Sequence, residues 1–349
     1  MSLWTKRHPI PNVYPKEFAS GESTTLDGKI WIVLEEGEYC VRRSNRSYQA
    51  SVFVFDPESE GYTQMNCTPN VWTTKLLCLA ANETDLYMWR VRGTDQHLYK
   101  LNGATLEWEN ILTVSHYVIW TNVVIINQLM YVLMKDRQND DLLLITIDLS
   151  DVQLLQIQTQ PMLAGLHSEF LTSHNNNLYL VGVINNIRIV FDIKNGEPVE
   201  IAQEEEPRNY TPRNMKPAHF ANSNDCVAYI HDHLTFGTRS FDFESLKWTS
   251  EVTTDIPGTP HFKFYSLVKM NGLLYNLVRL WTPNDTHFEL YVLDLHPKLT
   301  SICLADLTNS LSEESDEKKI ESVKQQLPIP MRGKLEELIE WRREADDEE

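Results

Sequence analysis

The chain has 349 residues, with 31 Lys and Arg against 49 Asp and Glu, and a formal net charge of −18 at pH 7. Such an acidic chain is not expected to bind nucleic acid through the phosphate backbone, because that mode needs a dominant Lys and Arg surface. Hydrophobic residues make up 42% of the chain and charged residues 23%, as in folded soluble proteins rather than disordered ones. The composition therefore predicts a folded protein with a sizeable core.

The sequence carries no targeting or membrane signal. Its first residues lack the apolar stretch of a secretory signal, and its longest apolar runs, 117–126 and 142–147, are much shorter than a membrane span. The 5 cysteines are widely spaced without a Cys-x-x-Cys pair, so neither a disulfide framework nor a zinc site is indicated. We expect reduced thiols, no membrane contact and a location in the cytoplasm or nucleus.

A β-rich unit recurs six times along the chain. Residues 1–17 precede it and contain Pro9, Pro11 and Pro15, so they are predicted to be an extended N-terminal segment. In each unit a short apolar run ends in Asp or Asn, at Asp56, Asn102, Asp148, Asp192, Asp242 and Asp294. These positions are separated by 46, 46, 44, 50 and 52 residues, a regularity that indicates a repeat architecture.

Each unit is predicted to be a four-stranded β-meander. A further apolar run precedes every Asp or Asn run, at 30–34, 86–89, 129–133, 178–181, 227–230 and 273–277. The middle strands are almost continuously apolar, whereas the strand after the Asp begins with polar residues, which fits middle strands buried between neighbouring sheets and a last strand that meets solvent.

A single sheet of this kind cannot bury both of its faces, whereas six sheets arranged radially bury their faces against one another. We therefore predict an all-β fold, a six-bladed β-propeller of four-stranded antiparallel blades, at 18–308, with the segment 1–17 packed along the first or last blade.

An aromatic residue stands six positions after the Asp or Asn in three units, as Tyr62, Trp108 and Trp248, and the sixth unit contains Leu-Tyr-Val-Leu-Asp at 290–294. This pattern resembles the Kelch repeat in its divergent, F-box-associated form, although none of the six units has the Gly-Gly doublet of Kelch repeats. A WD40 propeller is the alternative, but the chain contains no Trp-Asp dipeptide. Trp31, Trp89, Trp108 and Trp248 are interpreted as residues that pack blades together.

The resemblance implies a non-enzymatic protein-interaction scaffold within an intracellular protein complex. Many propellers of this kind are substrate-recognition subunits of ubiquitin ligases, which is a second hypothesis. A third hypothesis is a propeller enzyme that acts on a sugar or small metabolite. No catalytic residue, metal ligand or cofactor site is assigned. The most metal-like cluster, His231 and His233 on one face of a strand, lacks a third ligand and is interpreted as part of a polar loop.

The candidate binding face is the one where the second-to-third-strand loops and the connections between blades open together. Arginine and tryptophan gather in these loops and suit a protein partner, with an acidic or phosphorylated peptide as the natural complement. The alternative is that nearby aspartates neutralise scattered arginines. RNA would bind only through such a local basic rim. The predicted partner-binding residues are Arg42, Arg43, Arg46, Arg90, Arg92, Trp120, Arg137, Arg279 and Trp281.

The C-terminal region differs in composition from the repeats. Residues 309–333 form a predicted polar linker, and 334–349 a predicted helix followed by an acidic tail. Leu335, Leu338 and Ile339 recur at helical spacing, with Trp341 extending the same side. Such a short helix is marginal alone, so it is predicted to contact a partner through these four residues. Packing on the propeller, or a disordered tail, remains open.

Overall fold

The computed structural model describes residues 4–11, 17–37, 48–65, 77–92, 94–103, 105–115, 118–136, 141–159, 166–185, 187–205, 219–221, 227–232, 237–248, 252–253, 262–270, 273–281, 286–294 and 335. Apart from the helical Leu335, the regular structure in these ranges is β-strand. Within the same ranges no helix is long and apolar enough to cross a membrane.

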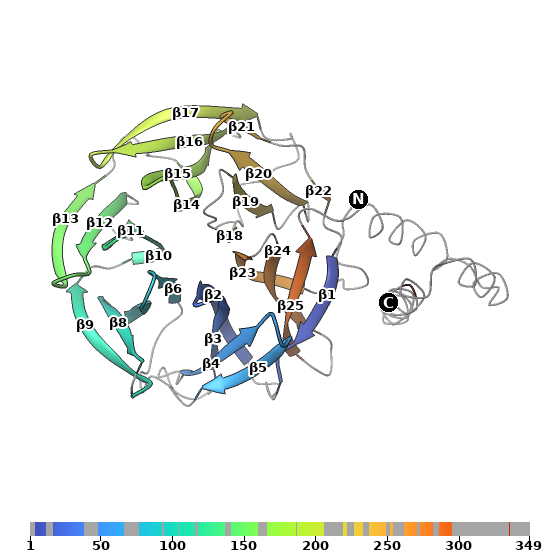
Figure 1. Ribbon diagram of the computed structural model, residues 1–349. Helices are drawn as coiled ribbons and strands as arrows, with labels where there is room; N and C mark the ends of the chain where they lie inside the picture. The colour runs from blue at the N-terminus through green and yellow to red at the C-terminus, as the bar shows by residue number, and fades with distance from the viewer. Residues whose placement is uncertain are drawn as a thin grey trace.

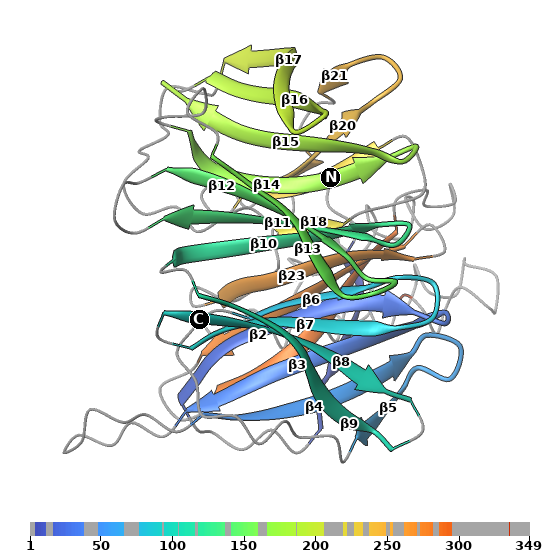
Figure 2. The same ribbon diagram turned by 90° about the vertical axis from the view of Figure 1, so that its left-hand side faces the viewer.

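Antiparallel sheets are arranged around a common centre (Figure 1), and in the side view their strands run between the two faces of the ring (Figure 2). In four sheets, consecutive strands are neighbours, as expected for a meander. The first is β2 (Glu17–Leu26), β3 (Lys29–Gly37), β4 (Tyr48–Asp56) and β5 (Gly61–Met65). The second is β6 (Leu77–Ala81), β7 (Leu86–Arg92), β8 (Asp95–Asn102) and β9 (Glu107–Ser115).

The next two sheets follow the same order around the ring. The third is β10 (Val118–Ile126), β11 (Leu129–Asp136), β12 (Leu142–Asp148) and β13 (Gln153–Thr159). The fourth is β14 (His167–His174), β15 (Asn177–Ile184), β16 (Ile187–Lys194) and β17 (Glu197–Glu205). A further sheet has shorter strands, and its last strand pairs with the third: β18 (His219–Ala221), β19 (Val227–Asp232), β20 (Gly237–Asp242), β21 (Lys247–Trp248) and β22 (Val252–Thr253).

The remaining four-stranded sheet joins the two ends of the repeat region. Its strands β23 (Phe262–Met270), β24 (Leu273–Trp281) and β25 (Thr286–Asp294) are followed by β1 (Trp4–Pro9), which pairs antiparallel with β25. The N-terminal strand therefore lies along the last blade, one of the two places predicted for it, and supplies the fourth strand of that sheet. The structure confirms an all-β propeller of four-stranded antiparallel sheets, five of which have this regular form.

The closure is reinforced where the first strands of the first and last sheets meet. The hydroxyls of Ser23 on β2 and Ser266 on β23 lie 2.9 Å apart, and the Ser23 amide donates to Ser266 Oγ at 3.0 Å. Both serines are buried, with 6% and 5% exposed. Two polar residues at a buried junction are therefore satisfied by each other across the point where the ring closes.

The recurring Asp or Asn is a turn residue. Asp56, Asp148 and Asp242 each accept, at Oδ1 and 2.9 Å, a hydrogen bond from the amide two residues further on. Such side-chain-to-backbone bonds favour a turn. Four residues after the Asp or Asn of four blades stands a residue with positive φ: Glu60 (52°), Leu106 (59°), Val152 (55°) and Leu246 (54°). The repeated acid thus fixes the reversal from third to fourth strand.

The hydrophobic core lies between blades rather than within a central layer. Five clusters each combine side chains of two adjacent sheets: the last with the first, the first with the second, and so on to the fourth with the fifth. On β7 every residue from Leu86 to Val91 is buried. This confirms the prediction that middle strands are covered on both faces by neighbouring blades.

The aromatic residues six positions after the Asp or Asn join each blade to the preceding one. Trp108 of the second sheet packs with Val33 and Val52 of the first, and Trp248 packs with the fourth sheet. Tyr62 Oη donates to the backbone carbonyl of His8 on β1 at 2.8 Å. Trp31 and Trp89 also belong to these clusters, so the interpretation of the four tryptophans as packing residues is confirmed.

Candidate functional site

Antiparallel order places the second-to-third-strand connections and the connections between sheets at one face of the ring, which we call the loop face. Arg92 ends β7, Arg279 and Trp281 lie in the last three residues of β24, and Trp120 is the third residue of β10. The backbone therefore brings these four positions to the same face. Arg42, Arg43, Arg46 and Arg137 of the predicted site lie outside the described residues.

Arg90 does not belong to an exposed rim. Its side chain is 1% exposed, because β7 continues to Arg92 and Arg90 pairs in register with Leu77 on one side and His97 on the other. Arg90 is predicted to lie in the second-to-third-strand loop, because the apolar run 86–89 ends just before it. In a propeller, however, the second strand has a neighbouring strand on each side and a neighbouring blade on each face. The side chains near its end, such as Arg90, are therefore still buried.

Arg90 is one of several charged side chains buried near the loop face. Asp136 ends β11 with 8% of its surface exposed, Arg188 is the second residue of β16 with 4%, and Glu289 on β25 has 3%. We call these four residues the buried charged layer. They lie in four different blades, each on a second or third strand and in the half of that strand nearer the loop face. Burying an ion costs several kcal/mol in effective terms, so such a layer is unusual for residues that only pack.

Specific contacts of this layer connect it to loops and aromatic rings. The Asp136 amide donates to the Asp141 carbonyl at 2.9 Å, which closes the base of the connection between β11 and β12. The Arg188 guanidinium lies 5.0 Å from the ring centroid of Trp248, within the range of a cation–π interaction. Trp89 Nε1 donates to Gln96 Oε1 at 2.9 Å beside Arg90. The layer therefore consists of positioned groups whose charges are held below the loops.

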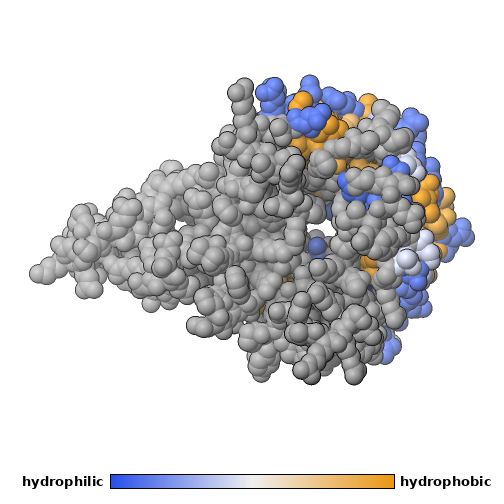
Figure 3. All heavy atoms as spheres, turned by 180° about the vertical axis from the view of Figure 1, so that it is seen from behind, coloured by the Kyte–Doolittle hydropathy of each residue, from blue (hydrophilic) through white to orange (hydrophobic). Residues whose placement is uncertain are grey.

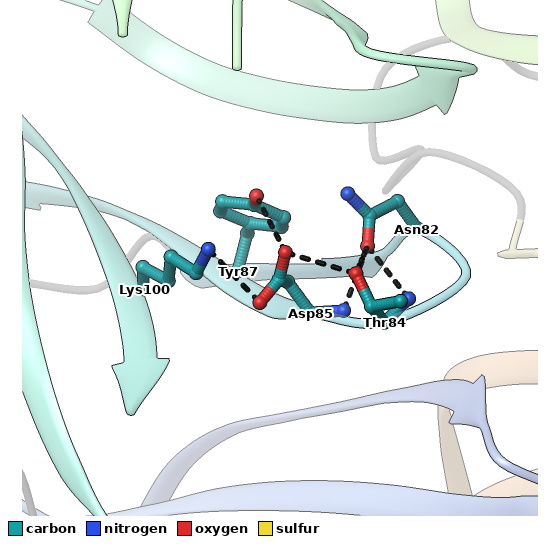
Figure 4. A network of polar contacts seen from close by, with 5 residues as sticks. All are labelled: Asn82, Thr84, Asp85, Tyr87 and Lys100. Atoms are coloured by element: carbon teal, nitrogen blue, oxygen red, sulfur yellow. Dashed lines mark hydrogen bonds and ion pairs between the residues drawn. The ribbon is translucent and has the colours of Figure 1, made fainter. Parts of the chain in front are cut away.

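At the opposite face, the turn between β6 and β7 carries a connected polar network (Figure 4). Asn82 Oδ1 accepts hydrogen bonds from the amides of Asp85 at 2.7 Å and Thr84 at 3.0 Å. Asp85 Oδ1 lies 2.9 Å from Lys100 Nζ, and Tyr87 Oη donates to Asp85 Oδ2 at 3.5 Å. The network ties the turn to β7 and β8.

The charges in this network are those of ordinary ionised groups. Partial burial of Asp85 opposes ionisation, yet its hydrogen bonds with Lys100 and Thr84 hold the pKa below its ordinary value. The bond to Asp85 raises the pKa of Lys100, and burial together with the Asp85 charge raises the pKa of Tyr87. All three shifts move away from neutrality, whereas a general acid or base needs a pKa near the working pH. The network is suited to holding a turn rather than to proton transfer.

No group of three or more His, Cys, Asp or Glu in the described part of the chain is placed to hold a metal ion. His231 lies on β19, while His233 is beyond the described residues. Of the predicted C-terminal contacts, Leu335 is helical and 0% exposed. Leu338, Ile339 and Trp341 lie outside the described residues, as does the linker.

The outer side of the ring carries apolar side chains that the sequence analysis does not single out. On β13, Leu154 is 40% exposed, Leu155 54% and Ile157 48%, and we call these three the outer-wall patch. Figure 3 shows apolar surface among hydrophilic surface along this side of the ring. The fourth strand of each blade is predicted to be polar. The sequence of β13, Gln-Leu-Leu-Gln-Ile-Gln-Thr, departs from this because it contains three large apolar residues and no charge.

Comparisons with known proteins identify the fold and no family. No family model matches the chain, and no curated protein does. A Trypanosoma rangeli sialidase in complex with the inhibitor DANA matches with TM-score 0.54 and 12% identity, over 88% of this chain and 58% of the sialidase. The same sialidase in complex with 2,3-difluoro-KDN matches with TM-score 0.50 and 9% identity, over 85% and 56%. This chain thus spans less than two thirds of these sialidase chains.

A 6-phosphogluconolactonase-like protein from Bacteroides uniformis matches with TM-score 0.45 and 13% identity, over 73% of this chain and 78% of that one. The sialidase matches, at 12% and 9% identity, support a β-propeller fold alone, so the Kelch-like assignment stays a prediction.

Proposed function

We propose that this protein is a non-enzymatic interaction scaffold, a six-bladed propeller of divergent Kelch-like type that binds a protein partner at its loop face within an intracellular complex. The observation that supports this proposal is the buried charged layer, Arg90, Asp136, Arg188 and Glu289, which lies below the loops in four blades. Recognition residues tend to lie on loops that a rigid scaffold positions, and these charges lie in the strand halves below such loops.

The layer places buried charged side chains at defined positions below the loops. The Asp136 amide is bonded to the Asp141 carbonyl, and the Arg188 guanidinium lies beside the Trp248 ring, so the backbone at one of these positions and the side chain at the other are held before a partner arrives. Preorganised groups lose less entropy on binding than mobile ones. The layer holds two arginines and two acids and so favours neither sign of ligand, whereas the predicted rim of Arg42, Arg43 and Arg46 favours an acidic or phosphorylated peptide as the bound segment.

The proposal is tested by affinity recovery of the tagged full-length protein from native extract, with identification by mass spectrometry. We expect a stoichiometric partner with the wild type and its loss with the triple variant R42E/R43E/R46E. A charge-matched control reverses three exposed lysines away from the loop face, K29E, K194E and K247E, and should retain the partner. Recovery without any stoichiometric partner would remove the support for a scaffold, and equal recovery by the triple variant would reject the rim.

A version that ends before Ser310 separates the loop face from the C-terminal helix. Because the proposed contact is at the loop face, we expect this version to retain the partner. Loss of the partner on truncation alone would instead favour the helix as the contact, as the ubiquitin-ligase hypothesis requires.

A further inference from the structure

The outer-wall patch lies on a strand that differs from its counterparts in neighbouring blades. β13 is the edge strand of its sheet and contains no charged residue. Its three large apolar side chains, Leu154, Leu155 and Ile157, are 40% to 54% exposed, although solvent-facing strands of a soluble protein normally carry charge at the edge. A cluster of this kind marks a surface that another molecule covers.

Acidic side chains flank the patch on both sides around the ring, where β9 and β17 are the outer strands of the adjacent blades (Figure 1). The exposed acids on these strands and on the turn before β13 are Glu107, Glu109, Asp151, Glu197, Glu200 and Glu205. The two described lysines nearest to these strands in sequence are engaged, with Lys100 Nζ 2.9 Å from Asp85 and Lys194 Nζ 3.2 Å from Asp192. The patch is therefore apolar at its centre and negative at its borders.

These charges decide between the occupants that the patch could accept. A second copy of this chain, itself at −18, would bring acidic outer strands against each other. Addition of an extended strand to the edge is also disfavoured, because the pairing of β12 with β13 shifts register between Thr146 and Ile147 and leaves Leu155 as a bulge. A segment that binds through side chains, with apolar residues at its centre and Lys or Arg around them, meets neither obstacle.

We propose that β13 is a docking surface for a basic amphipathic segment of a protein partner. The apolar side of the segment covers Leu155 and Ile157, and its cations meet the acids of β9 and β17. This surface is separate from the loop face, so it can be present or absent independently of the function proposed above.

The test uses the full chain and a labelled synthetic peptide of Leu and Lys at amphipathic helical spacing, with binding followed by fluorescence anisotropy. The variant is L155S/I157S, whose positions are exposed and whose fold should persist. The matched control is L246S, an equally exposed leucine (43%) in a turn of another blade. We expect about tenfold weaker binding for L155S/I157S and unchanged binding for L246S, because the apolar area of two side chains is lost from the interface.

Two further measurements locate the contact. Hydrogen exchange of 153–159 should slow when the peptide binds, and the same peptide with Glu in place of Lys should not bind. Equal affinity of L155S/I157S and wild type, or protection only at other strands, would overturn the proposal. So would a dimer in sedimentation velocity that L155S/I157S dissolves, because the patch would then belong to a second copy of the chain.

Discussion

Carboxylates at the third-strand ends act on the backbone rather than on a substrate. Asp148 Oδ1 also accepts a hydrogen bond from Ser150 Oγ at 2.6 Å, and Asp242 Oδ2 accepts one from Ser245 Oγ at 2.8 Å. These hydroxyl bonds, with those from the turn amides, hold the pKa of both carboxyls below the ordinary value. In the turn between β6 and β7, Asn82 Oδ1 binds the backbone amides of Thr84 and Asp85 in the same way. The residues that make the repeat visible in the sequence are therefore structural.

The pair of Asp85 and Lys100 gives a pH-dependent contribution to stability. Because the pKa of Asp85 is lowered in the folded state, its contribution is complete above the ordinary value of 3.8 and is lost as the pH falls through the folded pKa. We expect D85N to lower the free energy of unfolding by about 0.5 kcal/mol at pH 7, since the pair is partly exposed and screened.

This difference between D85N and wild type should shrink as the pH falls below 3.8, as measured by urea unfolding at a series of pH values. K194M, which breaks the more exposed pair with Asp192, serves as the control and should change stability less. A D85N deficit that persists unchanged at pH 2 would contradict the assignment.

Val152 has φ of 55°, a conformation that strains a β-branched residue, whereas Asn127 occupies the same region at 55° without such strain. We expect V152N to raise the free energy of unfolding by about 1 kcal/mol and N127V to lower it by about the same amount. Chemical denaturation of the two variants and wild type measures both effects. A loss of stability in V152N would mean that packing of the valine outweighs its backbone strain.

At the scale of elements, the N-terminal strand decides how the ring is closed. β1 supplies β25 with its outer partner, and Ile10 just after it donates its amide to the Phe288 carbonyl at 2.9 Å. Tyr62 extends the same junction from the first sheet, and burial, with a smaller contribution from Glu289, raises its pKa far above the ordinary range. The hydroxyl is thus neutral at every physiological pH and remains a hydrogen-bond donor.

Deletion of residues 1–11 should therefore open the ring at one junction. We expect a lower melting temperature, and faster hydrogen exchange at 286–294 than at strands such as 142–148, because β25 loses its outer neighbour. Tyr62→Phe removes one hydrogen bond at the same junction and should cost about 1 kcal/mol. A synthetic peptide of residues 1–11 added in trans should slow the exchange of β25 again. Unchanged exchange at 286–294 in the deletion would show that β1 is not required for closure.

For the molecule as a whole, local regularity could be predicted and long-range pairing could not. Asp56 to Asp294 reveal the repeat, and the apolar runs locate the middle strands, because both signals are local in sequence. The prolines of residues 1–17 predict an extended segment beside the first or last blade, but they do not indicate that it pairs with β25 as the fourth strand. Arg90 is predicted to lie in a loop but is buried in a strand, because the length of a strand depends on the neighbouring blades. The exposure of Leu155 could not be predicted, because it depends on which other segments pack against β13.

The clusters between adjacent sheets predict that the ring unfolds as one unit rather than blade by blade. Ile145 is 0% exposed and lies in the cluster shared by the second and third sheets. Ile145→Ala leaves a cavity at that boundary and should lower the free energy of unfolding by about 3 kcal/mol, whereas Leu155→Ala on the exposed side of the same sheet should change it by less than about 0.5 kcal/mol.

Tryptophan fluorescence and far-ultraviolet circular dichroism should report one coincident transition for both variants, because each blade depends on its neighbours to cover its faces. If Ile145→Ala instead splits the two probes into separate transitions, the second and third blades can unfold while the rest of the ring persists. The clusters would then stabilise pairs of blades rather than the closed ring.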